Sequence, residues 1–310
     1  MKKIQSNLHY YKISKENPEK FLDQNYMFVE KDLGMSFYVS KTHKIKELLT
    51  TIKNIKNKNN SEKLLNEIFL ELQNTIKKYS NYSEFGCFIN ACDSTIEENI
   101  NDIKLLKTIT FLYLEKRKLT DIVPSEWLQA IIDKGSSRKK GHAGEKKIMD
   151  ILEGSGFLKA KDIPDFKNYN KCSAKLSKRG KFSNKNIKKF FGISIGNKNQ
   201  DKSLDVIVKN GKEVFFIEAK HLNTGGGGQN KQVLELIEII RKNNAKNNYH
   251  FVAFLDGVFS NTLLSAGSEA ENKEEAVKTK LQYKDIMGAL NKNQNNFWVN
   301  TAGFRALFSD

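Results

Sequence analysis

The chain has 310 residues, of which 39% are hydrophobic and 28% are charged, and this composition excludes a disordered or fibrous protein. No apolar run approaches the roughly 18 residues that a membrane helix requires, so a membrane protein or membrane partner is not expected. Lysine and arginine total 52 against 36 acidic residues, a net charge of +16. This excess fits a polyanionic partner such as nucleic acid or, equally, a lysine-rich surface that reflects biased codon use.

The N-terminal part of the chain is predicted to be mainly helical. Residues 1–40 are expected to be irregular or weakly stranded, with a possible strand at residues 37–39. From residue 45 to residue 118, apolar side chains recur at helical spacing. Ser125 and Glu126 then favour the start of another helix. We interpret this part as a scaffold.

A basic segment follows. A helix is predicted over residues 143–153. Residues 171–200 contain nine lysines and arginines, no acidic residue, and three phenylalanines interleaved with the positive charges. This pattern is typical of a surface that contacts phosphates, and a solvated loop is the alternative.

The three cysteines match neither a zinc site nor a disulfide framework, so we expect a reducing, cytoplasmic setting.

The last hundred residues alternate between strand and helix patterns. Residues 204–208 and 213–219 predict two strands joined at Asn210-Gly211, a strong hairpin signal. After four glycines at 225–228, the pattern predicts a helix over 229–242, a strand over 250–255, a helix over 283–290, a strand over 297–299 and a helix near residue 304. This order predicts an α/β core with a mixed central sheet flanked by helices.

Three charged side chains stand at the ends of the hairpin strands. Asp205 opens the first strand, Glu218 lies near the end of the second, and Lys220 follows two residues later. Strand alternation therefore points Glu218 and Lys220 to one face. Carboxylate oxygens are preferred ligands of Mg²⁺, and a neighbouring lysine can orient a nucleophilic water. A surface ion pair at a strand end is the alternative.

The sequence around these residues resembles a known family. Leu204-Asp205, followed by Ile217-Glu218-Ala219-Lys220, is similar to the PD-(D/E)xK nuclease signature, with Leu204 where the signature has proline. The continuation through the glycine run and a helix to a strand closing on Asp256-Gly257 resembles the DpnII/MboI group of type II restriction endonucleases, with EcoRI-like features at residues 218–220. The resemblance covers residues 140–305 well and the helical part only loosely.

The resemblance implies a fold and a set of site roles. It implies a restriction-endonuclease-like nuclease core, which we expect over residues 126–310. The apolar periodicity predicts a mainly helical N-terminal region over residues 1–125, and the charge pattern predicts that the basic segment at 171–200 binds DNA. Asp205 and Glu218 would ligate Mg²⁺, and Lys220 would be the catalytic lysine. Such nucleases often have another acidic residue on a preceding helix, and Glu145 occupies that place as a further catalytic residue and metal ligand. An ordinary exposed helix glutamate is equally compatible with that position.

Other residues are candidates for DNA contact. A glycine loop lets the backbone approach a phosphate closely, and the amides at the start of the following helix face an anion; a flexible linker is the alternative. The candidates are His221, Asn223, Gly225, Gly226, Gln229, Asn230 and Lys231 beside the site, and Lys178, Arg179 and Lys181 in the basic segment.

We therefore expect a type II restriction endonuclease that binds a specific short double-stranded DNA sequence and uses Mg²⁺ to make double-strand breaks. Symmetric cutting favours a homodimer, and a cognate DNA methyltransferase is expected in the same host. A non-specific or structure-specific repair or junction nuclease is one alternative, against which the long helical region counts. A non-catalytic DNA-binding protein is another, against which the complete set of Asp205, Glu218 and Lys220 counts.

Overall fold

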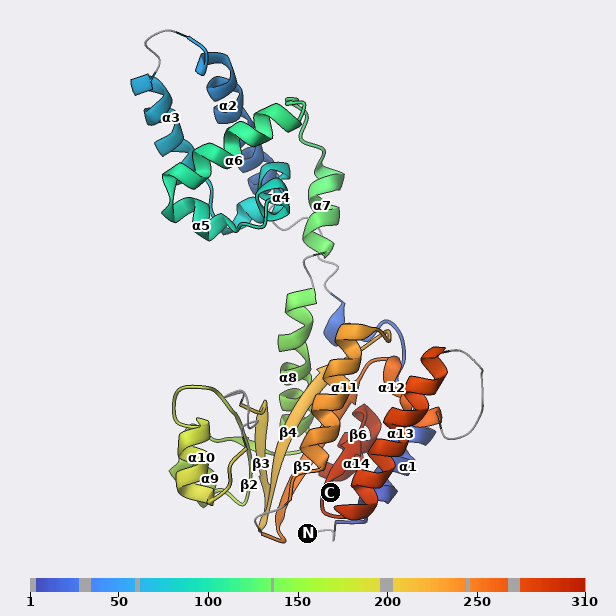
Figure 1. Ribbon diagram of the computed structural model, residues 1–310. Helices are drawn as coiled ribbons and strands as arrows, with labels where there is room; N and C mark the ends of the chain where they lie inside the picture. Colours follow the sequence, from blue (N-terminus) through green and yellow to red (C-terminus); the bar gives the residue numbers. More distant parts are fainter. Residues whose placement is uncertain are drawn as a thin grey trace. The chain divides into compact units, whose positions relative to one another are not determined.

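The computed structural model describes residues 4–27, 35–58, 62–134, 137–195, 203–243, 246–266 and 274–309. The chain divides into two compact units. One, here called the helical unit, comprises residues 28–137, and the other, the α/β unit, comprises residues 1–27 together with residues 138–310 (Figure 1).

The helical unit packs short helices around one apolar core. In chain order its elements are α2 (Met35–Ile55), α3 (Glu62–Thr75), the 3₁₀ helix η2 (Lys78–Tyr82), α4 (Glu84–Ala91), α5 (Ile96–Asn101), α6 (Ile103–Lys116) and α7 (Ser125–Lys134). Within the described part of the chain, no helix combines the length and apolar character needed to cross a lipid bilayer.

The strand expected at residues 37–39 is wrong, because these residues lie in the first turns of α2. Two aromatic contacts explain the helical conformation there. The ring of Phe37 packs edge-on against Tyr79 at 5.3 Å, and the ring of Tyr38 packs edge-on against Tyr82 at 5.5 Å. Tertiary packing against η2 therefore outweighs the strand preference of these residues.

A six-stranded sheet forms the centre of the α/β unit. Its strands are β1 (Leu158–Lys159), β2 (Lys171–Lys175), β3 (Val206–Asn210), β4 (Glu213–His221), β5 (Tyr249–Asp256) and β6 (Phe297–Val299), arranged in that order. β3 runs antiparallel to both of its neighbours, β2 and β4, whereas the pairs β1–β2, β4–β5 and β5–β6 are parallel. The sheet is therefore mixed, as the sequence predicted.

Helices cover both faces of this sheet (Figure 1). The first face, here called the α11 face, packs against α9 (Ile163–Asn168), α10 (Asn184–Phe191), α11 (Gly227–Ile240), α12 (Phe259–Ser265) and α13 (Glu274–Lys292). The second, here called the α8 face, packs against α8 (Ser137–Gly154), α14 (Thr301–Phe308) and α1 (Asn7–Glu16). Side chains alternate between the two faces along each strand, and both sets are apolar, so the sheet is buried on both sides.

The predicted hairpin is confirmed. Asn210 pairs with Glu213 across a tight turn in which Gly211 has φ +64, a conformation that glycine adopts without steric cost. The same register pairs Val206 with Ile217. Asp205 is the residue before Val206 and Glu218 the residue after Ile217, so the two carboxylates lie opposite each other at the end of the hairpin.

The division of the chain differs from the boundary expected between residues 125 and 126. α7 belongs to the helical unit, and residues 1–27 belong to the α/β unit. α1 lies against β6 and α14, where Ser14 accepts the backbone N–H of Asn300 at 3.2 Å and its carbonyl accepts from the Asn300 side chain at 3.0 Å. Residues 1–27 therefore belong to the α/β unit, whereas the sequence predicted a separate N-terminal region that included them.

Candidate active site

Asp205, Glu218 and Lys220 come together on the α11 face. The Lys220 ammonium pairs with Oε1 of Glu218, and Oδ2 of Asp205 accepts the backbone N–H of Ala219 at 2.8 Å. Glu218 and Lys220 are on the same side of β4 as Phe216, whereas Ala219 faces the α8 side. The site therefore has two carboxylates and one ammonium at the carboxyl end of β4.

The electrostatics of this group favour an added positive charge. The Glu218 side chain is only 3% exposed and that of Lys220 is 14% exposed. Burial and the neighbouring Glu218 carboxylate raise the pKa of Asp205 to about 7, against the opposing effects of the Ala219 amide and Lys220. Two neighbouring carboxyl groups, one of which has a raised pKa, are a suitable donor set for a hard divalent cation.

Glu145 approaches the group from α8. Its carboxylate contributes to the raised pKa of Asp205, which places it within electrostatic range of that residue. Its Oε2 lies 3.3 Å from Nζ of Lys175, the last residue of β2. Glu145 is therefore at the margin of the site, where its carboxylate pairs with a lysine on the neighbouring strand.

Two further charged residues were not foreseen from the sequence. Oε2 of Glu235 on α11 lies 3.9 Å from Nζ of Lys220. Lys242 donates to the carbonyl of Ile195 at 2.8 Å, and burial lowers its pKa although Glu218 acts in the opposite direction. Glu235 lies on α11 and Lys242 follows the end of that helix at Ile240. The hairpin signal alone does not reveal that the chain returns across the α11 face in this way.

The candidate DNA-contacting residues after Lys220 differ in how exposed they are. Gly225 and Gly226 precede α11, which begins without a side-chain cap on its first amides. Gln229 is partly exposed and Lys231 is exposed. Oδ1 of Asn230 accepts from Gln282 on α13 at 3.3 Å.

Asn223 and His221 are engaged within the unit. Oδ1 of Asn223 faces the backbone N–H of Val258 at 3.4 Å. The His221 side chain is on the α8 face, opposite to Lys220, where it stacks on Tyr26 with ring centroids 3.5 Å apart. Because strand alternation turns consecutive side chains to opposite faces, the expected DNA contact by His221 has no support in this geometry.

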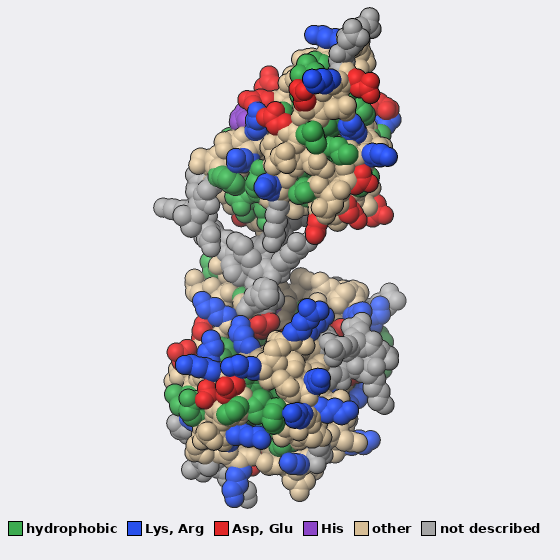
Figure 2. Space-filling model, turned by 90° about the vertical axis from the view of Figure 1, so that its left-hand side faces the viewer, with side chains coloured by type: hydrophobic (Ala, Val, Ile, Leu, Met, Phe, Trp, Pro, Cys, Tyr) green, Lys and Arg blue, Asp and Glu red, His purple; other side chains and the backbone are tan. Residues whose placement is uncertain are grey.

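The basic segment begins beside the site. Lys175 pairs with Val206 in register, and the backbone N–H of Leu176 donates to the carbonyl of Asp205 at 2.9 Å. Lys178, Arg179 and Lys181 follow in an exposed loop that leads to α10, whose lysines are also exposed. Figure 2 shows lysine and arginine side chains spread over this side of the α/β unit, with few acidic ones among them. Residues 196–200 of the segment lie outside the described ranges.

A second acidic cluster lies on the α8 face. Carboxylate oxygens of Glu19, Asp23 and Asp256 lie within 4.8 Å of one another. The ammonium of Lys147 already lies 2.6 Å from Asp23 and 2.8 Å from Asp256. An internal cation therefore already pairs with two of the three carboxylates of this cluster.

Comparison with known proteins gives one match. The model of the DpnII restriction endonuclease family matches residues 139–292, a range that includes Asp205, Glu218, Lys220 and Glu145. None of the curated proteins and none of the solved structures compared with the chain shows a significant match. The matched residues contain strands β1 to β5 of the mixed sheet and the flanking helices from α8 to α13, which is compatible with a restriction-endonuclease-like core. Residues 139–292 of the chain therefore match the DpnII restriction endonuclease family.

Proposed function

We propose that this protein is a type II restriction endonuclease that recognises a specific short sequence in double-stranded DNA and hydrolyses its phosphodiester bonds with Mg²⁺. The observation that carries the proposal is the convergence of Asp205, Glu218 and Lys220 at one end of the sheet. We place it in the cytoplasm as a homodimer, with a cognate methyltransferase that protects the host DNA.

In this proposal Asp205 and Glu218 hold the metal, with Glu145 as a further ligand. Their oxygen donors, their burial and the pKa of Asp205 near neutrality all fit a hard divalent cation. A bound Mg²⁺ would supply an acidified water and would offset the charge that develops at phosphorus.

Lys220 has two tasks in the proposed reaction. Without substrate it neutralises Glu218. With a phosphate present, the same ammonium can orient the attacking water and stabilise the pentacovalent charge, as preorganised donors do. Asp205 is fixed by the Ala219 amide, so one ligand carboxylate already has its orientation before the metal binds.

The exposed basic loop is proposed to bind the DNA backbone. Replacing Lys178, Arg179 and Lys181 by glutamine should lower the slope of log K against log salt by up to about 2.7, because each phosphate contact contributes about 0.9. A matched control replaces Lys212, Lys246 and Lys292. These exposed lysines precede or lead into β4, β5 and β6, so they lie at the opposite end of the parallel strands, and their loss should leave the slope almost unchanged.

Cleavage of phage DNA tests the catalytic proposal. The wild-type protein should give discrete fragments with Mg²⁺ and none with EDTA. Lys220→Met should abolish cleavage while DNA binding persists, and Lys212→Met, in the turn before the other end of β4, should cut normally. A smear of fragments would mean that the protein cuts DNA without sequence specificity. A gel shift without cleavage would mean that it only binds DNA. Normal cutting by Lys220→Met would refute the assigned role.

A further inference from the structure

A buried ion network lies on the opposite side of the sheet from the proposed site. Nζ of Lys147 lies 2.6 Å from Oδ2 of Asp23 and 2.8 Å from Oδ2 of Asp256, and the side chains of Lys147 and Asp256 are 5% and 1% exposed. Removing one member of such a buried pair leaves an uncompensated charge, which is strongly unfavourable. The network therefore fixes the elements that carry it.

The network involves α8, which carries Glu145, and β5, which pairs with the strand that carries Glu218 and Lys220. Asp256 is the last residue of β5, and it pairs in register with His221, the residue after Lys220. Nδ1 of His221 lies 3.8 Å from Oδ2 of Asp256. Lys147 is on α8, two residues after Glu145. One ammonium thus connects the helix that carries Glu145 with the strand ends beside Lys220.

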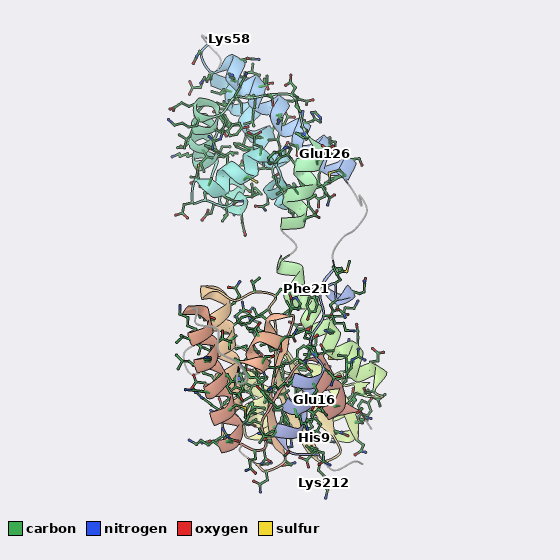
Figure 3. The ribbon with its side chains drawn as sticks, turned by 90° about the vertical axis from the view of Figure 1, so that its right-hand side faces the viewer. His9, Glu16, Phe21, Lys58, Glu126 and Lys212 are labelled. Atoms are coloured by element: carbon green, nitrogen blue, oxygen red, sulfur yellow. The ribbon has the colours of Figure 1, made fainter. Side chains whose placement is uncertain are left out.

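The N-terminal segment closes the network. Asp23 caps the 3₁₀ helix η1 (Gln24–Tyr26) by accepting from the backbone of Asn25, and Tyr26 stacks on His221. Earlier in the segment, Oε1 of Glu19 accepts the backbone N–H of Thr301 at 2.7 Å. Figure 3 shows Phe21, within this segment, at the end of the α/β unit opposite to Lys212. Lys212 precedes β4, so the segment lies at the end of the sheet where Lys220 is found.

We propose that Lys147 is a positioning residue of the nuclease, which holds Glu145 beside Asp205 by fixing α8 to Asp256 and to the N-terminal segment at Asp23. This inference rests on the proposed function. Its physical basis is that α8 carries both residues within one turn, so a shift of the helix at Lys147 moves Glu145 as well. Misplacement of a catalytic group by about 1 Å can lower a rate about 100-fold.

The test is a double-mutant cycle in kcat and in the Mg²⁺ concentration that gives half-maximal cleavage. Lys147→Met should lower kcat at least about tenfold and raise the half-maximal Mg²⁺ concentration. In a Glu145→Gln background the same change should have little further effect, because the group that it positions is already removed. Lys146→Met, which removes the adjacent exposed lysine, should leave both quantities unchanged.

Asp23→Asn provides a second route if Lys147→Met fails to fold. It removes the partly exposed carboxylate and keeps the buried pair between Lys147 and Asp256, and it should shift the Mg²⁺ dependence in the same direction by a smaller factor. Equal losses from Lys147→Met in both backgrounds, an unchanged Mg²⁺ dependence of the folded variants, or full activity of Glu145→Gln would each overturn the positioning role. A wild-type protein that does not cut DNA with Mg²⁺ would instead refute the proposed function.

Discussion

The raised pKa of Asp205 makes a sharp prediction for the metal-free protein. In the folded state this pKa is about 7, whereas an unperturbed aspartate has 3.8. As the pH rises from about 4 to about 7, the unfolded chain loses this proton and the folded chain keeps it, so the free energy of unfolding falls with pH and then levels off. We predict that Asp205→Asn removes this fall, because the amide does not ionise and its oxygen can still accept from Ala219.

The magnitude follows from the difference between the two pKa values. At about 1.4 kcal/mol per pKa unit, the variant should be more stable than the wild type by about 2 kcal/mol at pH 5 and by at most about 4 kcal/mol above pH 8. Residual structure in the unfolded chain lowers the upper figure. The stability gained by Asp205→Asn should therefore increase between about pH 4 and about pH 7 and then stay constant.

Urea unfolding in EDTA, followed by the fluorescence of Trp298, measures this difference. Trp298 is fully buried in the α/β unit and Trp127 is 71% exposed in the helical unit, so a Trp127→Phe background makes the signal specific for the α/β unit. Asp150→Asn, at an exposed position of α8, is the control and should change the stability by less than about 0.5 kcal/mol throughout. A difference between Asp205→Asn and the wild type that does not vary with pH would refute the reasoning.

Two further predictions concern the α/β unit away from the site, and both use the same fluorescence assay. His250→Ala should lower the free energy of unfolding by about 2–4 kcal/mol, because the buried ring lies 2.7 Å from Oε2 of Glu213 and 2.8 Å from the carbonyl of Asn295; Glu213→Gln keeps an acceptor and should cost less. Gly303→Ala should cost about 1–3 kcal/mol, since its Cβ would lie 2.1 Å from Oγ of Ser14. Gly288→Ala on α13, where the Cβ meets nothing within 4 Å, should instead stabilise by up to about 1 kcal/mol, and the opposite order would contradict the packing described for α1.

The parts of the fold that depend on local signals were predictable. Asn210-Gly211 between two apolar runs indicates a hairpin because a two-residue turn needs those residue types, and the structure confirms it. The strand at residues 297–299 was predicted with the bounds that β6 has. β2 was not predicted, because lysines at both of its ends place its short buried centre in a segment that is dominated by positive charge.

The parts that depend on distant residues were not predictable. α1 has weak amphipathic character of its own and is buried by β6 and α14, which follow it by almost the whole chain. The network at Lys147 joins residues 23, 147 and 256, and no spacing in the sequence connects them. The three side chains of the proposed site were placed together correctly because one hairpin carries them all, whereas their roles in catalysis and those of the DNA-contacting candidates stay predictions.

The contact between Ser14 and Asn300 has a consequence for the order of events on the ribosome. The helical unit draws only on residues 28–137, so it can fold while the rest of the chain is still being made. α1 must wait for Asn300, 286 residues later, before it can be buried, and contacts of such high sequence separation form late. A ribosome-bound chain that has not yet reached β6 would therefore lack a completed α/β unit, although its helical unit could already be folded.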